Sequence, residues 1–162
     1  MDGQSDAVVV RSLKREDVAR LVRMDRAITG RIRSAWYEGK LKRALADSDV
    51  NVSLGAVVDG CLVGAILGSL HYGEFGLPEP IAVLDTILVD PARPREGIGT
   101  ALLVQLVKNL RAFGIDRLRT EVAWNEHDLN RFLGRRGFSL APRLVLELSL
   151  ARVPVEEDAS GA

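Results

Sequence analysis

The sequence predicts a single α+β domain built on a mixed, mostly antiparallel sheet with helices on both faces. The 162-residue chain is long enough for one domain with a substantial core. Its apolar residues recur at helical spacing in some segments and in strand-like runs in others. The resulting order, β-α-α-β-β-β-α-β-α-β, does not alternate regularly enough for a doubly wound parallel sheet. We expect the domain to span residues 8–150, with a disordered N-terminus at 1–7 and a flexible acidic tail at 151–162.

The first part of the chain is expected to form a strand followed by two helices. Segment 8–13 begins with β-branched residues and is predicted to be a strand. Segment 15–28 has apolar residues at helical spacing and ends close to Gly30. Segment 34–46 has a second apolar side of the same kind, which predicts a second helix.

A β-hairpin is expected next. Two apolar runs, 52–58 and 61–70, are separated by Asp59 and Gly60. An Asp-Gly pair between β-rich runs favours a tight two-residue turn, because both positions adopt a positive φ angle.

The second half of the chain is expected to begin with a buried strand. Segment 81–89 is almost continuously apolar, as in a strand covered on both faces. Segment 97–113 has one apolar stripe and is followed by Gly114, which predicts a helix ending at a C-terminal glycine. Three further segments follow: a strand at 117–124, a short helix at 126–136 and a final strand at 138–150.

Composition and charge exclude several classes of function. Lys and Arg number 22, as do Asp and Glu, so a protein that binds nucleic acid chiefly through phosphate contacts is not expected. The single cysteine cannot form an internal disulfide. No stretch approaches the ~20 apolar residues of a membrane span, and residues 1–7 do not have the layout of a signal peptide. We therefore expect a cytoplasmic protein without membrane contact, and no residue pattern predicts a metal site.

The most informative local feature is the loop between the strand at 81–89 and the helix at 97–113. It ends in the run Arg95-Glu96-Gly97-Ile98-Gly99-Thr100. Glycines let the backbone bend sharply and approach a ligand. The first N–H groups of a helix lack intrahelical partners and carry the positive end of the helix dipole, so this junction is a candidate anion site. The alternative is a helix start whose glycines only allow a tight turn.

Two familiar phosphate loops do not fit this junction. A P-loop ends in Gly-Lys-Ser/Thr, which the chain lacks. A dinucleotide fingerprint needs a third glycine or alanine where Leu102 stands, and its glycines follow the strand almost at once. Here Pro91 and Pro94 lie in between. Glu121 has the spacing of a ribose-binding acid, but this is weak evidence without the other features.

The arrangement strand, Val-Asp-Pro, loop, Gly-Ile-Gly-Thr, helix resembles the GNAT superfamily of acetyl-CoA-dependent N-acyltransferases. The similarity extends over residues 8–150 in element order, and includes Asn125 and the Gly137-Phe138 pair after the last helix. It implies that acetyl-CoA is the co-substrate. It also implies that the acetyl group passes directly to a primary amine on a small molecule, a protein N-terminus or a lysine.

The resemblance also implies roles for individual residues. The backbone of the run Arg95-Glu96-Gly97-Ile98-Gly99-Thr100 would hold the pyrophosphate of the cofactor. Leu88 and Val89 would offer backbone groups to the pantetheine arm, and Asn125 would contact the same arm. The family separates the two strands that flank this arm, so we expect a cleft between the strands at 81–89 and 117–124.

The chain departs from the family pattern at two positions. Pro94 stands where the signature has Gln or Arg, which removes one backbone N–H that Arg93 or Arg95 would have to replace by charge. Leu133 stands where the family has the tyrosine that protonates the departing thiolate. These departures support the alternative of a non-catalytic acyl-CoA-binding or regulatory module.

Acetyl transfer to an amine needs a base, and Asp85 is the first candidate. By strict strand alternation it shares a face with Ile87 and Val89, within an apolar run that would desolvate its carboxylate. Its structural alternative is a salt bridge, for instance to Arg119. Glu74 is the second candidate for the base.

Other polar residues are weaker candidates, each with a structural alternative. His127 could act as the acid in place of the missing tyrosine, although a surface histidine explains it equally. Glu79, His71 and Tyr72 fall in the same region as Glu74. A cationic cluster on and before the second helix would border the acceptor or form a solvated face: Arg31, Arg33, Lys40, Lys42 and Arg43. The resemblance further makes a homodimer an option, with the final strand as its route.

Overall fold

The computed structural model of the protein describes residues 7–46 and 52–153. Residues 1–6 of the N-terminus expected to be disordered (1–7), and residues 154–162 of the expected acidic tail (151–162), lie outside these described residues. The chain divides into two compact units, residues 1–126 and 127–162. The grouping of both into one domain over 8–150 stays a prediction.

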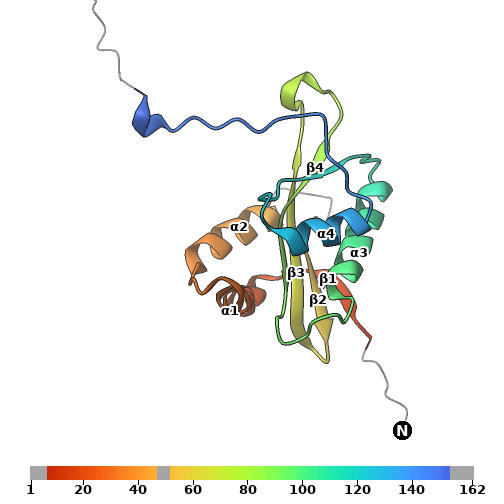
Figure 1. The fold of residues 1–162 in the computed structure, drawn as a ribbon. Helices are drawn as coiled ribbons and strands as arrows, with labels where there is room; N and C mark the ends of the chain where they lie inside the picture. The colour runs from red at the N-terminus through yellow and green to blue at the C-terminus, as the bar shows by residue number, and fades with distance from the viewer. Residues whose placement is uncertain (1–6, 47–51, 154–162) are drawn as a thin grey trace, which may run out of the picture. The chain divides into compact units, whose positions relative to one another are not determined.

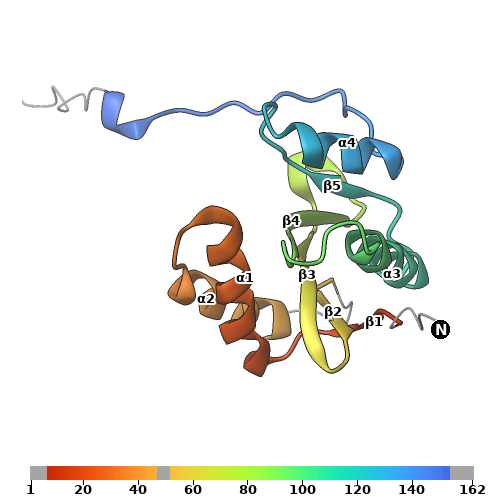
Figure 2. The same cartoon turned by 60° about the horizontal axis from the view of Figure 1, so that its bottom comes forward.

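The first unit is built on a mixed five-stranded sheet with the strand order β1-β2-β3-β4-β5. Strands β1 to β4 are labelled in Figure 1, and β5 is labelled in Figure 2. The first four strands are antiparallel neighbours, and β5 runs parallel to β4. The mixed, mostly antiparallel sheet predicted from the sequence is therefore confirmed. The strands are β1 (Val9–Ser12), β2 (Leu54–Val58), β3 (Cys61–His71), β4 (Ile81–Val89) and β5 (Leu118–Thr120).

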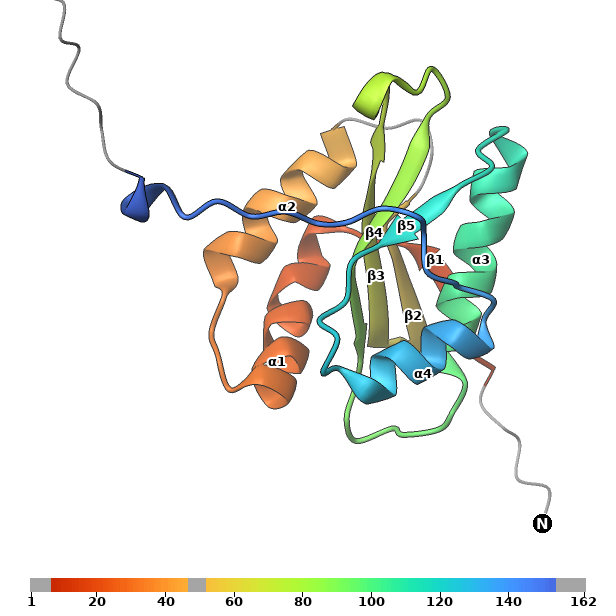
Figure 3. The ribbon, with the colours of Figure 1, turned by 45° about the horizontal axis from the view of Figure 1, so that its top comes forward.

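Helices cover both faces of this sheet, as the sequence predicted. Helices α1 (Val18–Thr29) and α2 (Ser34–Ala46) lie on one face and α3 (Ile98–Ala112) on the other (Figures 2 and 3). The core on the α1 and α2 face joins apolar side chains of both helices to the sheet: Leu13, Leu21, Met24, Tyr37, Leu41, Leu62, Ala65, Leu67 and Leu88. No helix in the described ranges is long and apolar enough to cross a membrane.

Turn chemistry at the ends of these elements follows the sequence. Asp59 and Gly60 have φ angles of 49° and 76°, and Val58 pairs with Cys61, so the predicted two-residue hairpin turn is confirmed. Gly30 closes α1 in the left-handed region, with its N–H bonded to the carbonyl of Arg26.

Strand β4 contains an irregularity that period-two reasoning did not predict. In its register with β3, Leu84 pairs with Gly68 and Thr86 with Leu67, so Asp85 is an extra residue without a partner. This β-bulge interrupts the alternation of faces along β4. Asp85 therefore does not share a face with Ile87 as expected, because the pairings beyond the bulge are shifted by one residue.

Helix α3 approaches the sheet closely at one glycine. A Cβ on Gly64 of β3 would lie 2.5 Å from Cγ2 of Ile98 and 3.2 Å from Cδ1 of Leu102. Only glycine leaves room for the first turns of α3 here. The sheet thereby positions the start of α3, where the candidate anion site lies.

Strand β5 is much shorter than the predicted 117–124. Only Leu118–Thr120 pair with β4, opposite Ala82–Leu84. Beyond this point β4 has no partner on its β5 side among the described residues. The prediction made the strand too long because it used only the alternation of apolar and polar side chains. That alternation can continue where the backbone no longer pairs with a neighbouring strand.

In the second unit, α4 (His127–Arg135) is confirmed, but the predicted final strand is wrong. Residues 138–149 have no assigned strand, and a short 3₁₀ turn (Leu150–Arg152) follows. The segment has the apolar alternation of a strand but no described strand pairs with it. Several of its apolar side chains are consequently exposed: Leu140, Leu144, Val145, Leu146 and Leu148.

Candidate functional site

The candidate anion site is the start of α3. Gly97 is the N-cap residue with φ 72°, and Arg95 has φ 64°, so the chain turns twice in the left-handed region before the helix. The first intrahelical bond runs from the N–H of Ala101 to the carbonyl of Gly97, and no side chain caps the helix. The N–H groups of the first turn are thus available to an external acceptor at the positive end of a 15-residue helix.

Two arginines flank this turn, and they differ in their partners. Arg93 forms an ion pair with Glu96, with 3.3 Å between NH1 and Oε2. Arg95 forms no ion pair among the described residues. Of the two cations expected to offset Pro94, Arg95 is therefore the one whose charge is not already matched by a carboxylate.

The loop before the helix is anchored to α1 through Asp90. Its Oδ2 lies 2.5 Å from NH2 of Arg20, whose Nε also donates to the carbonyl of Leu62. Its Oδ1 accepts the N–H of Ala92, and its own N–H donates to the carbonyl of Val63. The sequence did not single out Arg20, because this pairing joins residues far apart in the chain.

The hydrogen bond from the N–H of Asp90 to the carbonyl of Val63 shows how the β4 backbone is oriented. Because the N–H of Asp90 points to β3, alternation directs the backbone groups of Val89 and Ile87 away from β3 and those of Leu88 toward it. Since β5 pairs only as far as Leu84, the backbone of Ile87 and Val89 faces an edge without a strand neighbour in the described chain. This is the separation of strands that the family resemblance implied.

Asn125 lies in a turn rather than at the end of a strand. Asn125 is five residues beyond the end of β5. The N–H of Glu126 donates to the carbonyl of Ala123 across the turn that contains it. The Asn125 side chain is exposed. His127 is the first residue of α4 and belongs to the second unit.

Asp85, the first candidate base, is paired rather than desolvated. Its Oδ2 lies 2.5 Å from Nζ of Lys40 on α2, and its Oδ1 accepts the hydroxyl of Thr86. Lys40 also stands 5.2 Å from the ring centroid of Trp36. The salt-bridge alternative is thus realised, but with Lys40 in place of Arg119.

Glu74, the second candidate base, is held by two cationic or hydrogen-bonding partners. Its Oε1 is 2.6 Å from Nδ1 of His71, and its Oε2 accepts NH2 of Arg119 at 3.0 Å. The hydrogen bond with His71, followed by that with Arg119, lowers the pKa of the Glu74 carboxyl. On the other side of the imidazole, Oγ of Ser69 lies 2.9 Å from Nε2. We call Ser69, His71, Glu74 and Arg119 the Ser69–Arg119 cluster.

This cluster and Asp85 lie on the same face of the sheet. Ser69 and His71 follow Leu67 at a period of two along β3, and Leu67 belongs to the core beneath α1 and α2. Ser69 is directly opposite Val83, which is opposite Arg119 on β5. Both sequence-derived bases are therefore brought to the α1 and α2 face, where each is already paired with a cation or an imidazole.

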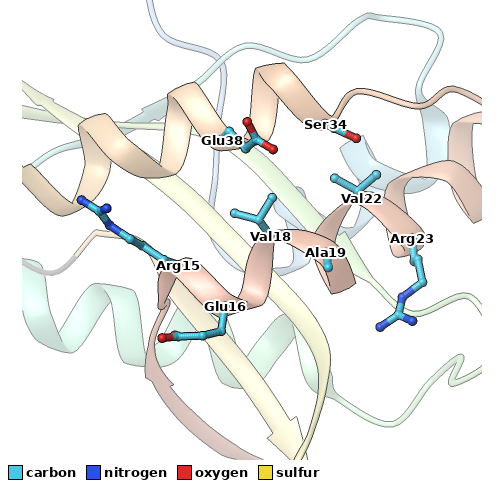
Figure 4. Close-up of a pocket in the computed structure, with 8 residues that line it drawn as sticks. All are labelled: Arg15, Glu16, Val18, Ala19, Val22, Arg23, Ser34 and Glu38. Atoms are coloured by element: carbon cyan, nitrogen blue, oxygen red, sulfur yellow. The ribbon is translucent and has the colours of Figure 1, made fainter.

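A depression of about 560 Å³ lies elsewhere, between α1 and α2 (Figure 4). None of the residues predicted from the sequence as catalytic or cofactor-binding lines it. Its lining is Arg15, Glu16, Val18, Ala19, Val22, Arg23, Ser34 and Glu38.

Comparisons with known proteins identify the family. Residues 19–138 match the acetyltransferase (GNAT) family. A comparison with curated protein sequences finds no match.

Solved structures share the fold at low sequence identity. An aminoglycoside N-acetyltransferase in complex with CoA has a TM-score of 0.76 at 14% identity, covering 93% of this chain and 99% of its own. The PaiA N-acetyltransferase of Thermoplasma acidophilum, in complex with coenzyme A, has a TM-score of 0.68 at 20% identity, with coverages of 83% and 91%. The ribosomal-protein-alanine N-acetyltransferase of Brucella melitensis biovar Abortus 2308 has a TM-score of 0.69 at 21% identity, with coverages of 88% and 99%.

The matched region contains strands β2 to β5, including the pairing of β4 with β5 that stops at Leu84, and the turn into α3. The chain belongs to the acetyltransferase (GNAT) family, whose co-substrate is acetyl-CoA.

Proposed function

We propose that this protein is an N-acetyltransferase that moves an acetyl group from acetyl-CoA directly to a primary amine while both substrates are bound. The acceptor would be a small molecule or a protein N-terminus or lysine. The observation that carries the proposal is the start of α3, where Gly97 in the left-handed region leaves the first-turn N–H groups available. Such a helix start binds phosphate groups through backbone N–H donors and the helix dipole.

The residues that would hold the co-substrate follow from this geometry and from the family. The pyrophosphate would lie on the backbone of Arg95-Glu96-Gly97-Ile98-Gly99-Thr100, with the charge of Arg95 offsetting the N–H that Pro94 lacks. The pantetheine arm would pair with β4, chiefly through Val89 and Ile87, with Leu88 and Asn125 completing the proposed set. Bound acetyl-CoA supplies an activated acetyl thioester.

The chain would contribute orientation, polarisation and a proton acceptor. Holding amine and thioester together supplies up to about 7–11 kcal/mol in the best intramolecular cases. A backbone N–H near Val89 would polarise the thioester carbonyl. Asp85 and Glu74 remain in the proposed set as carboxylates near the acceptor, and His127 as the proposed acid. Transfer would take place in the cytoplasm, where acetyl-CoA is formed and used.

A second candidate function is an acyl-CoA-binding or regulatory module without turnover. Pro94 and Leu133 favour it, because they replace a phosphate donor and the usual acid of the family. This module would bind acetyl-CoA as tightly as the enzyme but would release no thiol when amines are added.

Self-association is also part of the proposal. Segment 138–149 has no described partner strand, and its leucines alternate with Val145, Glu147 and Ser149. An extended segment with alternating apolar residues can add to a strand of similar pattern in another chain. A second copy of this chain offers the same segment, so we propose a homodimer formed through it.

A pair of glycine variants tests the co-substrate site. Gly97→Ala and Gly114→Ala act at opposite ends of α3, at φ angles of 72° and 69°, and neither added Cβ meets an atom within 4 Å. Each should therefore lower stability similarly, by about 1–2 kcal/mol. We expect only Gly97→Ala to weaken acetyl-CoA binding, by about tenfold in calorimetry. Equal weakening by both variants would contradict the assignment.

Turnover is tested with a thiol-detecting reagent and a panel of spermidine, lysine, kanamycin and peptides with free N-termini. Release of CoA that depends on one of these amines supports the enzyme. Tight acetyl-CoA binding without amine-dependent release from any of them supports the module instead. No thermal stabilisation by millimolar acetyl-CoA or CoA would contradict both functions.

A further inference from the structure

The Ser69–Arg119 cluster forms an ordered chain of hydrogen bonds. Oγ of Ser69 is 2.9 Å from Nε2 of His71, Nδ1 of His71 is 2.6 Å from Oε1 of Glu74, and Oε2 of Glu74 accepts from Arg119 at 3.0 Å. The lowered pKa of the Glu74 carboxyl keeps it ionised, so it can only accept hydrogen bonds. Nδ1 of His71 must then carry a proton, and when the ring is neutral Nε2 is left to accept the Ser69 hydroxyl.

The two carboxylates that the sequence suggested are poor proton acceptors in this arrangement. Asp85 is bound to the ammonium of Lys40 and to the hydroxyl of Thr86. Glu74 is bound to His71 and Arg119. Accepting a proton would break an ion pair in either case. A neutral imidazole with a free lone pair directed at a hydroxyl is a better base near neutral pH.

The cluster is also accessible from the face where Asp85 lies. Ser69 and His71 are half-buried, and the side chains of His71, Glu74 and Arg119 are exposed by 35%, 32% and 26%. Ser69 is opposite Val83, two residues before Asp85 in β4. The Ser69 hydroxyl therefore lies on the sheet face from which an amine would approach Asp85.

We propose that Ser69, His71 and Glu74 form a proton relay that deprotonates the acceptor amine, with Arg119 positioning Glu74. Ser69 takes the proton from the substrate ammonium as its own hydroxyl proton passes to Nε2 of His71. Glu74 holds the ring orientation and stabilises the imidazolium. The inference rests on the proposed transfer function and assigns its base.

The reaction balances with the substrates already named. The relay removes one proton from the ammonium, and the neutral amine forms a bond to the acetyl carbon. The C–S bond breaks, the amide nitrogen loses its second proton, and the thiolate takes up one proton. One proton in total is released to water, so no further reactant is required.

The charged groups that face the imidazole come from two elements. The Glu74 carboxylate of the β3–β4 connection contacts the ring, and the Arg119 guanidinium of β5 lies beyond that carboxylate. Ser69 contributes no charge. The acidic limb of the rate profile should therefore report His71 and should respond to substitution of Glu74.

The test measures kcat/KM against pH with the panel amine that the wild type acetylates fastest. We expect His71→Gln to lower kcat/KM by 100-fold or more and to remove the acidic limb. Ser69→Ala should lower the plateau by about tenfold while keeping the limb, because His71 is still present. Lys108→Gln, on α3 at the opposite face, is the matched surface control and should match the wild type. Acetyl-CoA affinity should be unchanged in every variant.

Nitrogen NMR of the imidazole rings gives a second readout. The chain has only 2 histidines, so the signals that remain in the His127→Gln variant belong to His71. Nδ1 of His71 should carry the proton at neutral pH, and the Nε2 resonance should shift in Ser69→Ala. A proton on Nε2 would overturn the relay.

Three further outcomes separate the relay from the function on which it rests. A wild type that acetylates no amine contradicts the proposed transfer. An active wild type whose Ser69→Ala and His71→Gln variants keep its kcat/KM and acidic limb overturns the relay alone. Acetylated Ser69 in intact-protein mass spectrometry, during turnover, would overturn it in favour of a covalent intermediate.

Discussion

Asp25 shows how a single side chain can tie two helices together. Its carboxylate is fully buried in α1 and bonds to both Nε and NH2 of Arg33, just before α2. These hydrogen bonds, more than the opposing desolvation, lower the pKa of Asp25. Burial together with the charge of Asp25 raises the pKa of the neighbouring Tyr37, whose phenol therefore stays neutral. The bidentate pair holds α2 where Lys40 can reach Asp85.

We predict that Asp25→Asn lowers stability at pH 7 by about 1–3 kcal/mol, since Arg33 loses a charged partner but remains partly exposed. A carboxyl whose folded pKa lies below its unfolded value stabilises the fold above the unfolded value and loses this contribution as pH falls through the folded value. The difference between wild type and variant should therefore be constant near neutrality and shrink below about pH 4. Urea unfolding at several pH values measures it.

Asp116→Asn is the matched control, because Asp116 is exposed in the loop before β5. It should change stability little at any pH. A pH-independent loss in Asp25→Asn would show that the charge of Asp25 is not what stabilises the α1–α2 connection.

Among the elements, turns were predictable and pairings were not. The Asp59-Gly60 turn follows from the backbone freedom of two adjacent residues, so the sequence is sufficient. The bulge at Asp85 depends on how β3 and β4 align, which period-two reasoning cannot detect. The segment 138–149 has the alternation of a strand, yet alternation reports only which faces are apolar, not whether a partner exists.

At the element scale, Gly64→Ala should displace the start of α3. Its Cβ would be 2.5 Å from Cγ2 of Ile98 and 3.1 Å from the carbonyl of Leu88. We expect a loss of about 1–3 kcal/mol in stability and weaker acetyl-CoA binding, because Ile98 begins the turn that would hold the pyrophosphate. Thermal unfolding and calorimetry measure the two effects.

Ile98→Ala removes Cγ2, the methyl carbon that the Cβ of Gly64→Ala would meet. The double variant Gly64→Ala/Ile98→Ala should therefore recover part of the acetyl-CoA binding that Gly64→Ala loses. Gly39→Ala is the control, since its Cβ in α2 would have only Arg43 NH1 nearby, at 3.9 Å. It should be neutral or slightly stabilising. A Gly64→Ala variant that binds acetyl-CoA like the wild type would contradict the coupling between this contact and the site.

At the scale of the whole molecule, the sequence predicted a co-substrate loop but not the arrangement around it. The run from Arg95 to Thr100 is continuous in sequence, so its motif could be read directly. The partners of Asp85 and Asp90, Lys40 and Arg20, come from helices distant in the chain. His71 was noticed beside Glu74, but the role proposed for it depends on its contacts with Ser69 and Glu74, which only the folded geometry shows.

The exposed C-terminal leucines lead to the last prediction. The side chains of Leu144, Leu146, Leu148 and Leu150 are 72–88% exposed. Burying one leucine side chain contributes about 1.5–3 kcal/mol. We expect light scattering to give twice the chain mass at micromolar concentration, and Leu144→Glu with Leu148→Glu to give the single-chain mass. Val104→Glu, at a 47% exposed position of α3, should leave the dimer intact. A wild type with the mass of one chain would contradict the dimer.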